Sequence, residues 1–265
     1  MVKIEDNMGN VFSKLNVTLK AWAFPIALLG LWQWCVNNQW VPLTLSSPEL
    51  IGDAFTEYAK SGELFIHSAI SIKRAILGLW FGSIIGLLLG FLMASTRVNN
   101  RIFTPTFRAL MQISAFAWIP LISVWFGTTE QARVIFISFV VIFPVALNTY
   151  EGIVGVPHAY REASQVLRLS RFRENVMVVL PSATPSILAG LELGMLYAWL
   201  ATIGAELLMG NGYGVGAMML AGQALFRMEV VFMGVIVCGV VGFGIAIITK
   251  LLNERLIKDG SGAIK

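Results

Sequence analysis

The chain has 265 residues, of which 57% are hydrophobic and 13% are charged, and its mean hydropathy is +0.75. Typical soluble domains carry roughly 25% charged residues. This composition excludes an ordinary soluble protein and predicts an integral membrane protein. The formal net charge of +4 is small, and it gives no indication of nucleic-acid binding.

Six weakly charged stretches are long enough, or nearly so, to cross a bilayer as helices, which takes about 20 residues for ~30 Å of hydrocarbon. They are residues 21–48, 75–96, 109–129, 134–150, 186–208 and 229–251. The prediction is an all-α membrane protein with about six transmembrane helices in one domain, residues 1–265. Five or seven spans remain alternatives.

The basic residues set the predicted orientation. Of 19 Lys and Arg residues, 14 fall on one side of these spans and five on the other. By the positive-inside rule, both termini and residues 151–182 are cytoplasmic, and residues 46–73 and 209–228 are periplasmic. We therefore expect a multi-pass protein of the bacterial inner membrane, with residues 1–20 retained as a cytoplasmic tail.

Residues 46–73 form an amphipathic periplasmic segment in this scheme. Ser47, Pro48 and Glu49 are a typical helix start, with a capping hydroxyl, a proline in the first turn and an acid near the positive end of the helix dipole. Apolar residues follow at helical spacing. The segment therefore predicts a helix on the outer surface.

Glycines recur at every fourth position in the second span. Gly78, Gly82, Gly86 and Gly90 lie on one helix face. Without side chains, this face allows another helix backbone to approach closely. We predict packing within the chain; a dimer seam is the alternative.

Histidines and nucleotide-binding motifs limit the enzyme hypotheses. His67 and His158 are the two histidines and lie on opposite predicted sides of the membrane. A histidine-based triad or two-histidine metal site is therefore excluded within one chain, and we predict neither catalytic nor metal-ligating residues. The chain also lacks a G-x-x-x-x-G-K-[ST] loop, so ATP would have to be bound by a partner.

A glycine-rich run, residues 210–216, permits a second hypothesis. Its Gly212-Tyr213-Gly214 is similar to part of a potassium-channel filter, but Gly210-Asn211 precede it instead of Thr-Val. An ion channel with a pore loop at residues 210–216 is therefore the alternative function. A turn-rich periplasmic loop is the preferred interpretation.

Two acids fall within the fifth span. Glu192 and Glu206 are 14 positions apart, or about four helical turns, so they lie on broadly the same face. A carboxylate at membrane depth faces protein or water. The two acids could line a translocation path or a dimer interface, or each could be hydrated near one membrane surface.

The longest charged insertion, residues 151–182, reads as a helical hairpin. Pro157 suits a first helical turn, and the next helix breaker is Pro181, which is expected to end a second helix running from Ser170. Ala163 and Ser164 are small and Glu162 is charged, so the first helix can be approached closely by another protein.

These residues resemble the cytoplasmic signature of bacterial ABC-importer permeases. Glu162, Ala163, Ser164, Val178, Leu180 and Pro181 match its positions. The likeness extends to Trp118-Ile119-Pro120-Leu121, Trp125-Phe126-Gly127, Ala198-Trp199, Ala205-Glu206 and Gly212-Tyr213-Gly214. It covers roughly residues 65–255 and looks like the permeases of the sulfonate, nitrate and taurine importers.

The resemblance implies a type I importer permease: a second permease copy, two cytoplasmic ATPases that hold ATP and Mg²⁺, and an outer substrate-binding protein delivering a small anion. It implies no cofactor in this chain. The ATPase-coupling residues would be Tyr160, Arg161, Glu162, Ala163, Ser164, Leu167, Arg168 and Pro181. The candidate path residues are Trp118, Trp125, Glu192, Trp199 and Glu206.

Two positions depart from the family pattern. Arg168 replaces the glycine of the signature, so it either adopts a left-handed backbone conformation at a cost near 1 kcal/mol or lengthens the first helix. Glu192 stands where relatives often have a basic residue, which weakens any inference about anion attraction at the inner mouth.

Overall fold

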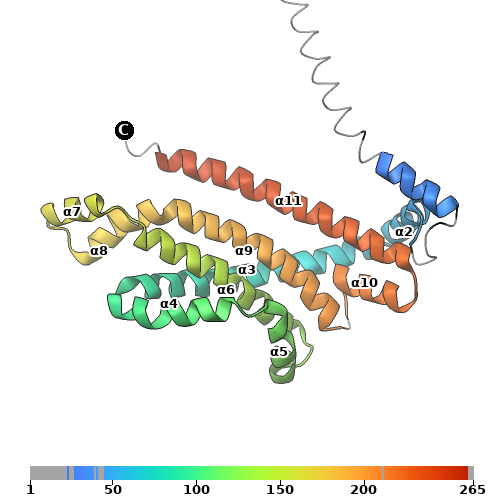
Figure 1. The fold of residues 1–265 in the computed structure, drawn as a ribbon, viewed down its shortest axis with the longest axis horizontal. Coiled ribbons are helices and arrows are strands. Elements are labelled where there is room, and N and C mark those ends of the chain that lie inside the picture. Colours follow the sequence, from blue (N-terminus) through green and yellow to red (C-terminus); the bar gives the residue numbers. More distant parts are fainter. Residues whose placement is uncertain (1–22, 24–26, 39, 41–44, 211, 262–265) are drawn as a thin grey trace, which may run out of the picture.

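The structure is a computed structural model that describes residues 23, 27–38, 40, 45–210 and 212–261, and within these residues all regular elements are helical. Residues 27–37 are helical, and the helices that follow are α2 (Pro48–Ser61), α3 (Glu63–Ser95), α4 (Arg97–Met111), η1 (Ala115–Trp118), α5 (Ile119–Phe126), α6 (Glu130–Val154), α7 (His158–Val166), α8 (Arg171–Glu174), η2 (Asn175–Val179), α9 (Leu180–Leu208), α10 (Val215–Ala224) and α11 (Met228–Ser261). Figure 1 shows α7 and α8 at one end of the long helices and α2 and α10 at the other.

Four helices in the described part of the chain are long and apolar enough to cross a membrane. They are α3, α6, the continuous helix 171–208, and residues 228–249 of α11. A bent pair, Val98–Met111 with Ala115–Phe126, makes a fifth if it counts as one span. The predicted first span, residues 21–48, falls partly outside the described residues, so the structure does not establish the predicted count of six.

Residues 109–129, predicted as one span, do not form one continuous helix. α4 ends at Met111, η1 begins at Ala115, and the two helix axes differ by 95°. Two polar residues, Gln112 and Ser114, interrupt the apolar sequence at this break. Non-helical backbone at membrane depth is tolerated only where protein or water surrounds it.

Helix α6 packs between α3 and α9. Glycines provide the close approach on the α3 side: a Cβ added at Gly82 would lie 2.6 Å from both the Ser138 carbonyl oxygen and Val141 Cβ. A Cβ at Gly86 would lie 2.8 Å from Val145 Cβ. Gly78 and Gly90 make the same kind of approach, so the glycine stripe packs within the chain.

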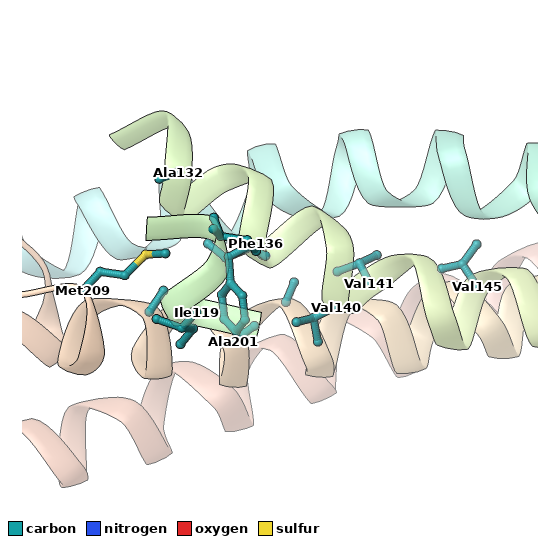
Figure 2. Packing of buried hydrophobic residues seen from close by; sticks show 12 residues of the cluster. Ile119, Ala132, Phe136, Val140, Val141, Val145, Ala201 and Met209 are labelled. Atoms are coloured by element: carbon teal, nitrogen blue, oxygen red, sulfur yellow. The ribbon is translucent and has the colours of Figure 1, made fainter. Parts of the chain in front are cut away.

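The largest buried apolar cluster lies where α5, α6 and α9 meet. Phe136 and Val141 of α6 are fully buried, and Ala201 of α9 and Ile119 of α5 pack in the same cluster. Figure 2 shows these side chains gathered between the helices. This core fixes the three helices relative to one another.

Helix α2 starts as its sequence predicts. The Ser47 hydroxyl accepts a hydrogen bond from the Leu50 N–H at 3.2 Å, and Pro48 is the first helical residue. The apolar side of α2, including Ile51, is buried in a cluster with Val230 of α11. α2 therefore packs against the ends of other helices of its own chain.

An ion pair joins α2 to the start of α11. Arg227 contacts Glu57 at 2.8 Å and Glu229 at 2.9 Å. The hydrogen bond and charge of Arg227 hold the pKa of Glu57 below its usual value. Both partners are substantially exposed, so solvent screening limits what this pair contributes to stability.

The predicted end of a helix at Pro181 is also wrong. A π-helical turn, η2, joins α8 to α9, and the helix runs unbroken from Arg171 to Leu208. Pro181 lies in the first turn of α9. The wider π-helical turn just before Pro181 allows the chain to continue, because it shifts the backbone hydrogen bonds by one residue.

Candidate functional site

The segment between α6 and α9 forms the predicted hairpin. α7 begins at His158 directly after Pro157, and it ends at Val166. The Ser170 side chain accepts a hydrogen bond from the Arg173 N–H at 3.4 Å and caps α8. In Figure 1 both short helices extend past the long helices at one end.

Arg168 makes the turn between the two short helices. Its φ is +50°, in the left-handed region that favours glycine. The Arg168 N–H donates to the Gln165 carbonyl at 2.9 Å and the Leu169 N–H to the Ser164 carbonyl at 3.0 Å, the pattern of a Schellman motif. Arg168 therefore ends the helix in a strained conformation and does not lengthen it.

The hairpin is anchored to the bundle by polar and apolar contacts. Arg161 donates to the Ile153 carbonyl oxygen at the end of α6, at 2.8 Å. Ser164 is 2% exposed and donates to the Arg161 carbonyl oxygen at 2.7 Å. Below them, Ile153 and Val179 belong to a buried cluster that joins α6 to the start of α9. The base of the hairpin is thus a fixed part of the fold.

The outer face of the hairpin is apolar and exposed. The exposed side chains include Tyr160 at 54%, Leu167 at 71%, Val166 at 83% and Phe172 at 77%. Glu162 and Ala163 are also exposed, whereas Ser164 turns inward. Several large apolar side chains exposed on one short polar segment are typical of a protein-binding surface.

A buried ion network occupies the opposite end of the molecule. Arg74 of α3 donates to Glu206 of α9 at 2.6 Å and binds Glu130 of α6 through two nitrogens at 2.5 and 2.7 Å. Arg133 also donates to Glu130, at 2.6 Å. Two arginines and two glutamates balance in charge, and the side chains of Arg74, Arg133 and Glu206 are at most 4% exposed.

Glu206 also holds the glycine-rich segment. Its carboxylate accepts from the Gly216 N–H at 2.9 Å and from the Ser71 hydroxyl at 2.8 and 2.9 Å. Gly214, with φ +141°, leaves room for this carboxylate, since a Cβ there would overlap it. The network therefore ties the start of α10 to α3, α6 and α9.

The same bonds argue against an ion-channel filter. The carbonyl oxygen of Tyr213 accepts from Arg74 at 2.6 Å, and that of Gly210 accepts from Arg133 at 2.5 Å. A potassium filter presents such carbonyls to cations, whereas here they face guanidinium groups. Residues 215–224 then form α10, so the predicted loop at 209–228 contains a helix.

The structure separates the five candidate path residues. Trp199 is 4% exposed and donates to the Cys238 carbonyl oxygen at 3.1 Å, so it joins α9 to α11. Glu206 is buried in the ion network. Trp125 is 66% exposed on α5, Trp118 of η1 packs against Phe139, and Glu192 is half-buried on α9. Trp199 and Glu206 therefore do not line an open path in this structure.

No group of three or more His, Cys, Asp or Glu side chains among the described residues could hold a metal ion. His67 instead binds the glycine-rich segment: its Nδ1 lies 2.8 Å from the Gly214 carbonyl oxygen and 2.9 Å from the Gly214 amide nitrogen. His67 therefore has a structural partner in the glycine-rich segment.

Comparison with known proteins assigns the family. A family model described as "binding-protein-dependent transport system inner membrane component" matches residues 64–258. The chain belongs to this family. It is a permease of the ABC-importer type and belongs to the sulfonate, nitrate and taurine group.

The permease is similar to relatives of comparable length. A protein named as the aliphatic sulfonates transport permease SsuC of Bacillus subtilis (strain 168) is 34% identical over 241 residues, 91% of this chain and 87% of that protein. The nitrate import permease NrtB of Leptolyngbya laminosa is 29% identical and covers 88% and 85%. The taurine transport system permease TauC of Escherichia coli (strain K12) is 26% identical and covers 91% and 89%.

Solved structures support the fold of the permease. The crystal structure of an amino acid ABC transporter with histidines matches with a TM-score of 0.64 at 16% identity, over 76% of this chain and 97% of that one. Inward-facing MetNI methionine ABC transporter matches with a TM-score of 0.52 at 15% identity. The architecture is thus that of type I ABC-importer permeases.

The permease sequence did not predict the ion network. In the sequence, Arg74 and Arg133 lie next to long uncharged stretches, and no motif includes Ser71. One clue was available, because a glutamate at the depth of Glu206 needs a partner. Which arginine from which helix supplies it depends on tertiary packing.

Proposed function

We propose that the permease is the transmembrane subunit of an ATP-driven importer of small oxyanions. Two copies would form the path, and each would bind one cytoplasmic ATPase, which holds ATP and Mg²⁺. A periplasmic or lipid-anchored binding protein would deliver the solute at the end that carries α2 and α10. Both termini and the α7–α8 hairpin would lie in the cytoplasm.

The observation that carries this proposal is the hairpin surface. It exposes Leu167 and Tyr160 to solvent while Arg161 and Ser164 fix its base to α6. An ATPase groove would cover the apolar side chains, and Glu162 would add a charged contact at the same face. The family's pairing with an ATPase supports this assignment.

Movement of the ATPases would reach the membrane through a rigid helix. Because α8, η2 and α9 form one helix from Arg171 to Leu208, a displacement of the hairpin displaces the whole span. Closure of the two ATPases on ATP would bring two hairpins together, and hydrolysis would release them. The permease would then alternate between two discrete states.

The relatives suggest the solute class. Their names specify aliphatic sulfonates, nitrate and taurine. A sulfonate group, which taurine also carries, and a nitrate ion each spread a negative charge over three oxygen atoms. We therefore propose a small oxyanion of this kind as the solute.

Charge reversal at Glu162 tests the coupling. In the complex reconstituted with its ATPase and binding protein, Glu162→Lys is expected to abolish substrate-stimulated ATP hydrolysis and to leave the thermal unfolding midpoint of the permease unchanged. The control is Glu49→Lys, the same charge change on exposed α2 at the opposite end, which should still copurify with the ATPase. Normal stimulation in Glu162→Lys would disprove the coupling role of this face.

A further inference from the structure

A cavity of about 400 Å³ lies where the break between α4 and η1 meets α6 and α9. Its lining comes from residues 111–115, from residues 140–148 of α6 and from residues 193–197 of α9. The midpoints of α6 (Glu130–Val154) and α9 (Leu180–Leu208) fall near residues 142 and 194. The cavity is therefore near mid-depth in both spans, and its volume is in the usual range for small-molecule sites.

Four polar side chains line this cavity: Gln112, Ser114, Asn148 and Tyr197. The Asn148 amide donates to the Pro144 carbonyl oxygen at 2.8 Å, which occupies one of its two N–H groups. Within the described part of the chain, the side chains of Gln112, Ser114 and Tyr197 have no hydrogen-bond partner. Each of the four can therefore still donate a hydrogen bond.

The cavity has no charged lining. Its other lining residues are apolar, and none of its lining residues is Asp, Glu, Lys, Arg or His. Hard cations such as Ca²⁺ and Mg²⁺ bind through carboxylate and other oxygen ligands, so this lining does not suit them. Neutral N–H and O–H donors suit an anion, since hydrogen bonds to a charged group are stronger than neutral ones.

The polar face is open in the single chain. Tyr197 is 47% exposed and the adjacent Leu193 is 40% exposed. Polar side chains and broken backbone at membrane depth face protein or water and avoid lipid. This side of the permease therefore faces the interior of the assembly, where a solute would pass.

We propose that Gln112, Ser114, Asn148 and Tyr197 form a transient binding site for a small oxyanion midway through the membrane. The inference rests on the proposed function and adds a place and a chemistry to it. The four side chains replace part of the hydration of the anion with neutral donors. Because no counter-charge lies in the cavity, the anion is held weakly enough to leave, as transport requires.

Thiol labelling tests the site in membrane vesicles that contain the whole complex. Ser114→Cys is made in a Cys35→Ser, Cys238→Ser background, and its reaction rates with 2-sulfonatoethyl and 2-(trimethylammonio)ethyl methanethiosulfonate are compared. Each rate is divided by the rate of the same reagent with free cysteine in solution, which removes the difference in intrinsic reactivity between the two reagents. After this normalisation, we expect the sulfonate reagent to react about tenfold faster than the trimethylammonium reagent. A factor of about ten is what one good hydrogen bond to an anion contributes.

Protection and substitution give a second measurement. Methanesulfonate and sodium nitrate should each slow labelling of Ser114→Cys, whereas choline chloride should not. Adding Asn148→Leu or Tyr197→Phe should abolish both the preference and the protection, with the thermal unfolding midpoint monitored for each. Two independent variants keep the test valid if one of them fails to fold.

The outcomes separate this site from the proposed function. Equal normalised rates for the two reagents, or no protection by either anion, would overturn the site. Uptake of radiolabelled methanesulfonate or nitrate by the reconstituted wild-type complex tests the importer itself. If Asn148→Leu and Tyr197→Phe take up the anion at the wild-type rate, the site alone is refuted. If the wild type shows no ATP-dependent uptake but keeps its labelling selectivity, only the proposed function is refuted.

Discussion

At the scale of single residues, the backbone of Arg168 is strained. A side chain at φ +50° places its Cβ close to the neighbouring carbonyl oxygen, at a cost of roughly 1–2 kcal/mol. Two hydrogen bonds of the Schellman motif hold it there. The hairpin thus keeps the turn that glycine would make freely.

Replacing this residue should stabilise the hairpin. Arg168→Gly is expected to lower the free energy of the folded turn by about 1 kcal/mol, because glycine adopts positive φ without the Cβ clash. Hydrogen exchange of the Leu169 amide measures the change. Arg168→Ala removes the charge but keeps a Cβ, so it should give no gain; equal protection in both variants would mean that the effect comes from charge.

The sequence predicts the residues of the hairpin but only part of their arrangement. It places the start of α7 correctly through Pro157, and it offers Ala163 as a small accessible residue, which is exposed in the structure. It does not show that Ser164 points inward, because that depends on how Arg161 reaches Ile153. Burial of one polar residue is decided by contacts between elements.

At the scale of helices, the glycine stripe decides how closely α3 and α6 pack. The Cβ positions of Gly78, Gly82, Gly86 and Gly90 are all occupied by atoms of α6. A four-residue period predicts one packed face from sequence alone. The partner helix could be named only from the structure, since a second copy would need the same period.

Even a single methyl group should be harmful in this stripe. Gly82→Ala is expected to destabilise the permease by about 1–3 kcal/mol, because its Cβ would lie 2.6 Å from the Ser138 carbonyl oxygen and α6 would have to move. Thermal unfolding in mild detergent measures the loss. Gly52→Ala in α2 is the matched control: it meets nothing within 4 Å, so it should be neutral or slightly stabilising.

A similar loss in both alanine variants would show that helix propensity, not close packing, controls these positions.

The two errors in the predicted helices have a related cause. Residues 109–129 satisfy the length and hydropathy of a straight span, and Pro181 satisfies the usual stop signal. The first stretch bends at the polar residues Gln112 and Ser114, and the second passes Pro181 through a π-helical turn.

At the scale of the whole molecule, the charge pattern and the fold agree on two distinct ends. The hairpin and the end of α11 lie at one end of the long helices, and α2 and α10 lie at the other (Figure 1). Successive membrane-crossing helices run in opposite directions, so the segments that connect them lie at alternate ends. The positive-inside rule assigns the cytoplasm to the end whose loops carry more Lys and Arg residues.

Cysteine labelling in intact cells tests that orientation. In a Cys35→Ser, Cys238→Ser background, Leu225→Cys is expected to react with a membrane-impermeant maleimide in spheroplasts, because Leu225 is 70% exposed at the predicted outer end. Leu167→Cys, 71% exposed at the other end, should react only after permeabilisation when the permease is expressed without its ATPase. The reverse pattern would invert the proposed topology.

The π-helical turn at Asn175–Val179 also sets the angular register between the hairpin and the span. Each residue of an α-helix rotates the chain by about 100° about the helix axis. Removing one residue from this turn would allow an ordinary α-helix to run straight through to α9. The helix would remain whole, and the surface carrying Leu167 would keep nearly its present direction, because the wider turn already accommodates one residue more than an α-helical turn. The same deletion within α9 would instead turn that surface by about a quarter of a circle, away from any ATPase positioned for the present geometry.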